Sequence, residues 1–409
     1  MMPLVVARLK WLSRKNPGYG EDIRERFGHI PKRDDQPLWI HAVSVGETIA
    51  SEPLVKLIQE THPDWPILIT NTTPTGAQQA KRLFGESVTR HFAPYDTPKA
   101  IHQFLDNARP RALVVMETEL WPNWISVLSR KNIPVLVANA RLSEKSAAGY
   151  ARLGGMAKEM MASITRVAAQ YDADAQRFLQ LGSAKESVFV SGNIKADIEI
   201  TETDRQLAQD EKNKISSQRT PILIAASTHP GEDEIVLDSF VQLRKEYPKA
   251  LLYLVPRHPE RADDVELLLN QRSLGFIKRT TNKSDVTPDD TVILCDKMGE
   301  LRALFGVADI AIMGGTFVDH GGHNPLEPAA WGMPIVAGPS QRNFDSLFNE
   351  MESFEALVRS ERTAEALSQT LVDLLGDGQR MQKTGAAALA YIQNQRGAVD
   401  RLLAAIESL

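Results

Sequence analysis

Three glutamates that follow predicted strands are candidates for a general base. Glu47 ends the run His-Ala-Val-Ser-Val-Gly-Glu at residues 41–47, and Glu117 and Glu119 follow the apolar run at 112–116. An ionised carboxylate that faces a cleft can take a proton from a substrate hydroxyl. We expect the start of the next helix to keep Glu47 ionised, because a helix N-terminus favours negative charge. The alternative is that Glu47 only caps its own helix.

Two motifs in the second half of the chain fit a phosphate group. Arg257 follows Pro256 at the end of an apolar run, and arginine offers phosphate a planar fork of N–H donors. The alternative for Arg257 is a surface salt bridge. A glycine-rich stretch at residues 314–322 leads into a predicted helix, whose free backbone N–H groups would attract a phosphate.

The residues that begin this helix fit a nucleotide as well. We expect Asn324 to be the N-cap and Pro325 the first helical residue, which are favoured positions for these residue types. Glu327, one turn further, can accept hydrogen bonds from ribose hydroxyls. The alternative is a strand, loop and helix in which the glycines serve only for turning.

No sequence pattern indicates a metal. The chain has no His-Glu-x-x-His, no clustered histidines and no Walker loop. Its single cysteine, Cys295, excludes a disulfide framework and a thiolate-rich metal site, and it fits a reducing compartment. We therefore expect no metal and no cofactor.

The elements that must position these residues alternate between short β-branched strands and amphipathic helices. This alternation is typical of βαβ units with a parallel sheet covered on both faces, in which ligands bind at the carboxyl ends of the strands. A polar connector at residues 199–219 separates two such series, so we expect two doubly wound α/β domains. The predicted strands are 38–43, 67–70, 112–116, 135–138, 167–169 and 188–191, then 222–226, 251–255, 292–294, 310–313 and 335–337.

Composition and charge narrow the class of protein. The chain has 409 residues, of which 43% are hydrophobic and 24% charged, as in soluble globular proteins. A net charge of −5 argues against general nucleic-acid binding, and no apolar run is long enough to span a bilayer. Residues 1–33, however, carry eight basic and three acidic residues, with apolar residues interleaved. This pattern fits a helix on an anionic membrane surface, or a solvated helix packed on the body.

Seven motifs of the chain stand out as a set. They are His-Ala-Val-Ser-Val-Gly-Glu at 41–47, Glu-Thr-Glu-Leu-Trp-Pro-Asn at 117–123, Asn-Ala-Arg-Leu-Ser at 139–143, Gly-Asn-Ile-Lys at 192–195, Pro-Arg-His-Pro-Glu-Arg at 256–261, Met-Gly-Glu-Leu at 298–301 and Gly-Gly-His-Asn-Pro-Leu-Glu-Pro at 321–328. Taken together, in this order and spacing, they make the sequence resemble the Kdo (3-deoxy-D-manno-octulosonic acid) transferases of lipid A assembly. The resemblance extends from about Asn16 to the C-terminus.

The resemblance implies a GT-B glycosyltransferase, in which two Rossmann-like domains face a central cleft. The expected parts are a basic amphipathic membrane-proximal segment at 1–35, an acceptor-binding domain at 36–204, a CMP-sugar-binding domain at 205–390 and a C-terminal helix at 391–409 that crosses back. The implied reaction is the inverting, metal-independent transfer of Kdo from CMP-Kdo to the lipid A precursor, lipid IVA. The implied location is the cytoplasmic face of the inner membrane.

The resemblance also assigns residues. Glu47 matches the family's catalytic base, and the segments that hold CMP are matched by Pro256, Arg257, Met298, Gly299, Glu300, Asn324, Pro325, Leu326 and Glu327. Further polar residues that follow predicted strands are candidates for the acceptor side of the cleft: Ser44, Thr73, Glu117, Glu119, Arg141 and Lys195. Two alternatives stay open, a GT-B nucleotide-sugar 2-epimerase and a catalytically silent nucleotide- or lipid-binding protein.

The chain departs from the family's pattern at its start. Only residues 1–12 precede the basic run Ser-Arg-Lys-Asn-Pro at 13–17, whereas members usually begin with a longer apolar anchor. We therefore expect attachment to the membrane surface rather than full insertion.

Overall fold

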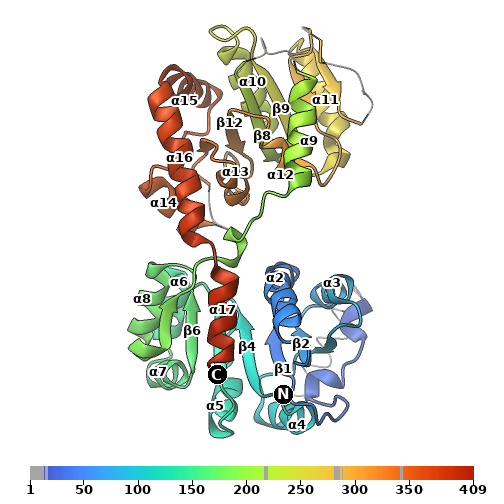
Figure 1. Ribbon diagram of the computed structural model, residues 1–409, viewed down its shortest axis with the longest axis vertical. Helices are drawn as coiled ribbons and strands as arrows, with labels where there is room; N and C mark the ends of the chain where they lie inside the picture. Colours follow the sequence, from blue (N-terminus) through green and yellow to red (C-terminus); the bar gives the residue numbers. More distant parts are fainter. Residues whose placement is uncertain (1–12, 14–16, 216–219, 281–285, 288, 341–343) are drawn as a thin grey trace. The chain divides into compact units, whose positions relative to one another are not determined.

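The computed structural model describes residues 13, 17–215, 220–280, 286–287, 289–340 and 344–409 (Figure 1). The chain forms two compact units, an N-terminal unit of residues up to Asp197 together with Gln395–Leu409, and a C-terminal unit of Ile198–Asn394. The boundary expected at 204/205 would cut helix α9 (Glu202–Asn213), which Thr201 and Asp204 start with a capping box. The connector that we expected at 199–219 is thus largely helical.

The N-terminal unit contains a parallel sheet of seven strands in the order β3-β2-β1-β4-β5-β6-β7. The strands are β1 (Leu38–His41), β2 (Ile67–Asn71), β3 (Thr89–Phe92), β4 (Ala112–Met116), β5 (Val135–Ala140), β6 (Arg166–Ala169) and β7 (Val188–Val190). The helices between them are α2 (Val45–Thr61), α3 (Pro74–Phe84), α4 (Pro98–Ala108), α5 (Pro122–Arg130), α6 (Glu144–Ala151), α7 (Gly155–Ala162) and α8 (Asp172–Leu181).

Alternate residues of each central strand face opposite sides of this sheet, because successive side chains of a strand point in opposite directions. Leu113 and Val115 of β4 belong to a core with Trp39 and Trp124. On the other side, Val114 of β4 packs in a core with residues of α2 and of the C-terminal helix α17 (Ala398–Glu407). This apolar packing explains why the last helix belongs to the N-terminal unit.

The C-terminal unit has the same architecture, with strand order β10-β11-β9-β8-β12-β13-β14. Its strands are β8 (Ile222–Thr228), β9 (Leu251–Pro256), β10 (Phe276–Lys278), β11 (Val292–Leu294), β12 (Ile310–Met313), β13 (Ile335–Ala337) and β14 (Val358–Arg359). Its helices are α9, α10 (Glu232–Leu243), α11 (Ala262–Gln271), α12 (Leu301–Leu304), α13 (Leu326–Ala330), α14 (Asp345–Ser353), α15 (Ala364–Gly376) and α16 (Gly378–Gln395). The expected α/β fold of two doubly wound parallel sheets is confirmed.

The described part of the basic N-terminal segment packs on the sheet. Arg26 is only 2% exposed, its guanidinium donates to the Thr72 carbonyl at 2.9 Å and lies 4.1 Å from the centre of the Phe92 ring. Arg26 is therefore not one of the surface cations that the charge pattern suggested. Residues 1–12 and 14–16, which carry most of the predicted membrane-surface helix, lie outside the described residues. Among the described residues, no helix combines the length and apolar character needed to cross a membrane.

Candidate functional site

Glu47 lies in the first turn of α2, directly after strand β1, and its side chain folds back over the start of the helix. Its carboxylate accepts the Val43 N–H at 2.7 Å and the Ser44 hydroxyl at 2.9 Å. The Ser44 hydroxyl in turn accepts the Glu47 N–H at 3.4 Å. This arrangement resembles a capping box, except that Glu47 accepts the N–H of the residue before the N-cap, so a structural role for Glu47 at the start of α2 is present. The same contacts hold the carboxylate in a defined position.

Burial changes the charge expected on Glu47. The residue is 8% exposed, and loss of solvation raises the pKa of its carboxyl to about 7, against the hydrogen bonds from Val43 and Ser44. The negative charges of Glu117 and Glu119 raise this pKa further. The expectation that the helix start keeps Glu47 fully ionised is therefore wrong, because desolvation outweighs it. A carboxyl with a pKa near 7 is instead suited to accept a proton at neutral pH.

Glu117 and Glu119 lie at the end of β4, the neighbour of β1 in the sheet. Burial raises the pKa of Glu119, and the charge of Glu117 raises it further. Glu117 has a φ of 59°, a left-handed conformation that is uncommon for residues other than glycine. Strained backbone of this kind is concentrated at functional sites. The structure thus brings the three candidate glutamates into one electrostatically coupled group.

The other acceptor-side candidates have structural contacts of their own. Thr73 caps α3, where its hydroxyl accepts the Gly76 N–H at 3.1 Å and donates to the Val43 carbonyl at 3.1 Å, which ties the α3 start to the Glu47 turn. Arg141 follows β5, and its carbonyl accepts the Thr118 hydroxyl. Lys195 lies in a short 3-10 helix, Ile194–Ala196, after β7.

A hydrogen bond from the segment that carries Lys195 to Asn139 on β5 places this segment near the middle of the sheet. The Asn139 side chain, buried on β5, accepts the Ile194 N–H at 3.1 Å. The 3-10 helix that carries Lys195 therefore lies beside the end of β5 rather than only at the outer strand β7.

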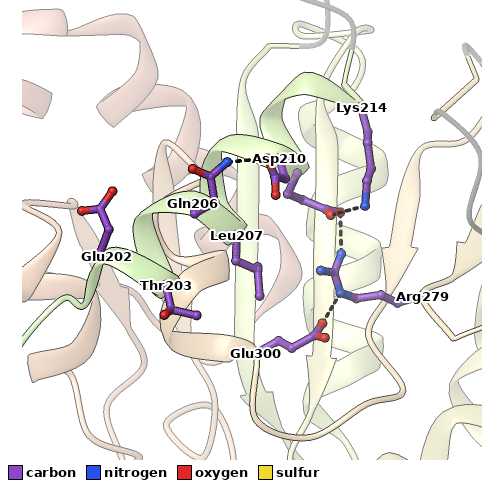
Figure 2. A pocket seen from close by; sticks show the side chains of 9 residues that line it. Glu202, Thr203, Gln206, Leu207, Asp210, Lys214, Arg279 and Glu300 are labelled. Carbon is purple, nitrogen blue, oxygen red and sulfur yellow. Dashed lines mark hydrogen bonds and ion pairs between the residues drawn. The ribbon is translucent and has the colours of Figure 1, made fainter.

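In the C-terminal unit, Met298, Gly299 and Glu300 follow β11. Met298 is 63% exposed, and Gly299 has a φ of 91°. Glu300 is paired with Arg279 at 2.6 Å and Lys297 at 2.7 Å, and it lines a cavity of about 580 Å³ beside α9 (Figure 2). Arg279 also pairs with Glu211, so the Glu300 carboxylate belongs to an ion-pair network that the sequence did not predict.

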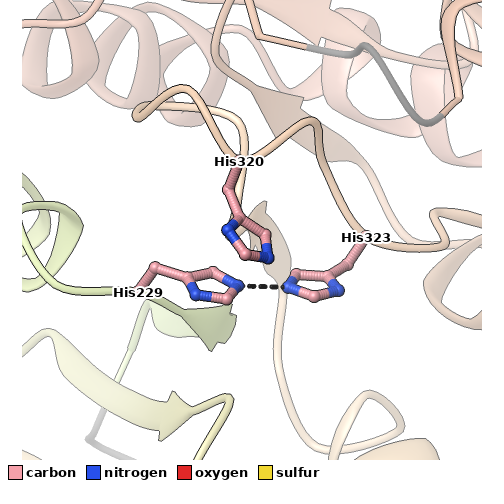
Figure 3. Close-up of side chains that lie close together, drawn as sticks. All are labelled: His229, His320 and His323. Carbon is pink, nitrogen blue, oxygen red and sulfur yellow. Dashed lines mark hydrogen bonds between the residues drawn. The ribbon is translucent and has the colours of Figure 1, made fainter. Parts of the chain in front are cut away.

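Pro256 ends strand β9, and Arg257 follows it with an exposed side chain at the carboxyl edge of the sheet. Next to it, three histidines come together: His229, directly after β8, and His320 and His323 in the loop before α13 (Figure 3). The expectation of no clustered histidines is corrected here, because the fold unites residues 94 positions apart.

Several positively charged side chains surround the histidines at this edge of the sheet. Burial lowers the pKa of His229 to about 4, and the neighbouring charges of His320, His258, Arg261 and Arg257 lower it further. Burial and the charges of His229 and Arg257 likewise lower the pKa of His323 to about 4. The imidazoles of His229 and His323 are thus neutral at pH 7, and the surrounding cations favour an anionic ligand.

The segment Asn324–Glu327 lies at the start of a helix, as predicted, but the helix begins one residue later than expected. The Asn324 side chain accepts the Leu326 N–H at 3.2 Å, but α13 begins at Leu326, so Pro325 is the N-cap rather than the first helical residue. Leu326 is 1% exposed and packs in the interior. Burial raises the pKa of the Glu327 carboxyl, and the charge of Arg302 lowers it.

Sequence reasoning missed the residue that holds these loops together. Glu232, at the start of α10, is fully buried and accepts three backbone N–H groups: from Gly315 at 2.6 Å, Phe317 at 2.8 Å and His229 at 2.9 Å. It therefore joins the glycine-rich loop to the end of β8. Its neighbour Asp233 accepts the Thr228 hydroxyl at 2.6 Å and pairs with Arg261. In the sequence, Glu232 and Asp233 are simply two acidic residues after a glycine, and this pattern does not predict that they hold the loops together.

Glu232→Gln is expected to lower the free energy of unfolding by about 1–3 kcal/mol. The amide replaces an oxygen with a donor, so at least one buried N–H loses its acceptor. The measurement is a urea unfolding curve, with the exposed Glu246→Gln as a matched control that should stay within about 0.5 kcal/mol of the wild type. Equal curves for all three proteins would contradict the proposed support of the loop.

The solved structures that resemble this chain define its fold. UDP-GlcNAc 2-epimerase from Neisseria meningitidis bound to UDP-GlcNAc has a TM-score of 0.56 at 14% identity, with 91% of this chain and 100% of that chain covered. Anabaena HepE in complex with UDP has a TM-score of 0.60 at 13% identity and the same coverage. Together with the two parallel sheets, they place the chain in the class of GT-B proteins.

Relatives in sequence define the family within this class. Residues 21–198 match the family described as 3-deoxy-D-manno-octulosonic-acid transferase (kdotransferase). The 3-deoxy-D-manno-octulosonic acid transferase of Haemophilus influenzae is 41% identical over 98% of this chain and 94% of its own length. That of Bordetella pertussis is 34% identical over 93% of this chain and 90% of its own length. The chain belongs to the Kdo transferase family, and it is a glycosyltransferase of lipopolysaccharide biosynthesis.

Proposed function

We propose that this protein transfers Kdo from CMP-Kdo to a hydroxyl of the lipid A precursor, lipid IVA, with inversion and without a metal. The observation that carries the proposal is the Glu47 carboxyl, which is buried, held by Val43 and Ser44 and has a pKa of about 7. A base with these properties is poised to take a proton from a weakly acidic hydroxyl at neutral pH.

In the proposed reaction, the acceptor hydroxyl displaces CMP from Kdo in a single step. The acceptor oxygen forms a bond to the anomeric carbon of Kdo, and the bond from that carbon to the phosphate oxygen of CMP breaks. The electron pair of the broken bond stays on the phosphate, while the hydroxyl proton passes to Glu47. Attack on the face opposite to the leaving group inverts the anomeric carbon.

The basic edge of the C-terminal sheet supports an anionic donor. Arg257 offers N–H donors to the single phosphate of CMP, and the cations around His229 add to the positive potential. Stabilisation of the negative charge that develops on the leaving phosphate lowers the barrier to transfer. We assign Glu327, beyond the glycine-rich loop, to the ribose hydroxyls. Met298, Gly299 and Glu300 supply further contacts of the CMP segment.

The direct test is an incubation of the full chain with CMP-Kdo and lipid IVA. Released CMP and an acceptor heavier by one or more Kdo residues are expected. CMP release without a change in acceptor mass would indicate hydrolysis and would contradict the proposal. UDP-GlcNAc in place of CMP-Kdo should show no epimerisation.

Activity is expected to survive an excess of EDTA. A donor with one phosphate needs no divalent ion to bridge two, and Arg257 can supply the positive charge. The measurement is the initial rate after dialysis against EDTA, compared with the rate after dialysis against buffer alone. Loss of activity that added Mg²⁺ restores would overturn the metal-independent mechanism.

We also propose that the protein works at the cytoplasmic face of the inner membrane, where its lipid acceptor lies. Residues 1–33 carry a net charge of +5, and each basic residue near an anionic surface contributes about 1 kcal/mol of attraction, which salt weakens. The full chain should co-sediment with anionic vesicles, less at high salt, and deletion of residues 1–15 should reduce binding. Equal binding by both proteins would contradict this role.

A further inference from the structure

The histidine cluster of the C-terminal unit has a geometry that phosphate binding alone does not explain. The Nε2 atoms of His229 and His323 lie 2.7 Å apart, and the planes of the two rings differ by only 6° (Figure 3). The ring of His320 stacks on that of His229 with 3.7 Å between centroids. One nitrogen from each of the three rings lies within 4.8 Å of the other two.

We propose that His229, His320 and His323 form a binding site for a transition-metal ion of the Zn²⁺ class. Three imidazoles with an open fourth position are a known ligand set for Zn²⁺, whereas Mg²⁺ and Ca²⁺ prefer oxygen ligands. The close His229–His323 contact holds one proton between two nitrogens, since two lone pairs or two N–H groups cannot face each other at this distance. When a metal binds both Nε2 atoms, the ring that carries this proton changes to its Nδ1–H tautomer, so both rings stay neutral and no proton is lost overall.

The two backbone segments that carry the ligands are held together. Glu232 accepts the N–H of His229 itself and those of Gly315 and Phe317, which precede His320 and His323 on their loop. Gly322 donates to the Gly315 carbonyl at 2.7 Å, which closes the loop next to His323. Buried support of this kind limits the freedom of the ligands before a metal binds.

Binding requires the rings to turn, and His320 must leave its stack on His229, because the lone pair of a ring nitrogen lies in the ring plane. A tetrahedral ion with Zn–N bonds of about 2.0–2.1 Å needs its nitrogens about 3.4 Å apart, somewhat more than the 2.7 Å between His229 and His323. His320 is exposed and His323 half-buried, so these two rings have room to turn, whereas His229 is buried and fixes the position. Arg257, Arg261 and His258 add positive charge near the cluster. They oppose a bare dication, so the ion binds together with an anion or hydroxide as its fourth ligand.

The test is a titration of the EDTA-treated, dialysed full chain with Co²⁺ alone, followed by competition with Zn²⁺. We expect one ion per chain, visible absorption bands of four-coordinate Co²⁺, and loss of these bands as Zn²⁺ is added. His320→Ala should weaken the affinity for both ions at least about tenfold, because even the loss of an outer-shell partner has that effect. His323→Gln provides a second variant, with circular dichroism to verify folding.

His102→Ala is the matched control. It removes an exposed imidazole of α4 in the N-terminal unit, so it should leave stoichiometry and affinity unchanged. Absence of four-coordinate Co²⁺ bands in the wild type would overturn the proposal, as would equal affinities in the wild type and both ligand variants. Because no donor or acceptor is present, either result leaves the proposed transfer untouched.

Discussion

Glu47→Gln is expected to lower the rate of Kdo transfer by about 10²–10⁴-fold, the usual contribution of a general base, while CMP still binds. The amide has nearly the same shape as the carboxyl but cannot take the hydroxyl proton. CMP affinity should persist because the residues assigned to CMP belong to the other unit. The measurements are turnover with CMP-Kdo and lipid IVA, and calorimetric titration with CMP.

The control for this variant must separate catalysis from support of the helix start. The Glu47 carboxylate accepts the Val43 N–H and the Ser44 hydroxyl at the start of α2, and loss of contacts at a helix start costs about 0.5–2 kcal/mol of stability. Glu52→Gln changes a partly exposed glutamate on the same helix, paired with Lys56, and should keep normal turnover. Equal loss of CMP binding and of turnover in Glu47→Gln would mean that Glu47 is only structural.

The pH dependence gives an independent measure of the same group. A base works when it is ionised, and the pKa of Glu47 is about 7. The rate of transfer should therefore rise with pH, about tenfold per unit below pH 7, and level off above it. A rate that is constant between pH 5 and pH 8, with the protein folded throughout, would exclude Glu47 as the base.

Arg257→Ala and Glu327→Ala are expected to weaken CMP binding by about 1.5–3 kcal/mol each, or about ten- to 150-fold in Kd. Arg257 would lose a charged hydrogen bond to phosphate, and Glu327 would lose its bonds to the ribose. The measurement is calorimetry with CMP on the purified full chain.

Two exposed residues of the same types are the controls for this pair. Arg380→Ala on α16 and Glu365→Ala on α15 remove the same charges from exposed positions outside the segments assigned to CMP, and both should bind CMP normally. Unchanged CMP affinity in both Arg257→Ala and Glu327→Ala would show that the donor site lies elsewhere.

The central strands were predictable from the sequence because burial on both faces demands an unbroken apolar run. The run at 112–116 became β4 without any change of bounds, and 292–294 became β11 likewise. Three strands were missed: Thr89–Phe92, Phe276–Lys278 and Val358–Arg359. Each lies at an edge of its sheet, where polar residues are tolerated and no apolar run is required.

Only those parts of the candidate site that lie within a single sequence motif were predictable from the sequence. Glu47 and Arg257 stand directly after strands, so their place at a sheet edge followed from the pattern. His320 and His323 are close in sequence, but their contact with His229 and the bonds of Glu232 depend on loops from different strands, which no single segment reveals. The charge of Glu47 was mistaken for the same reason, since its burial depends on the packing of the whole unit.

The packing of α17 against α2 sets an order for the folding of a new chain. Leu402 and Ile406 of α17 share a core with Leu54 and Ile58 of α2, more than 300 residues earlier. A ribosome completes the entire C-terminal unit before it releases the helix that finishes the N-terminal one. The unit that begins first is therefore completed last, and until then the apolar faces that α17 covers stay open to chaperones or to aggregation.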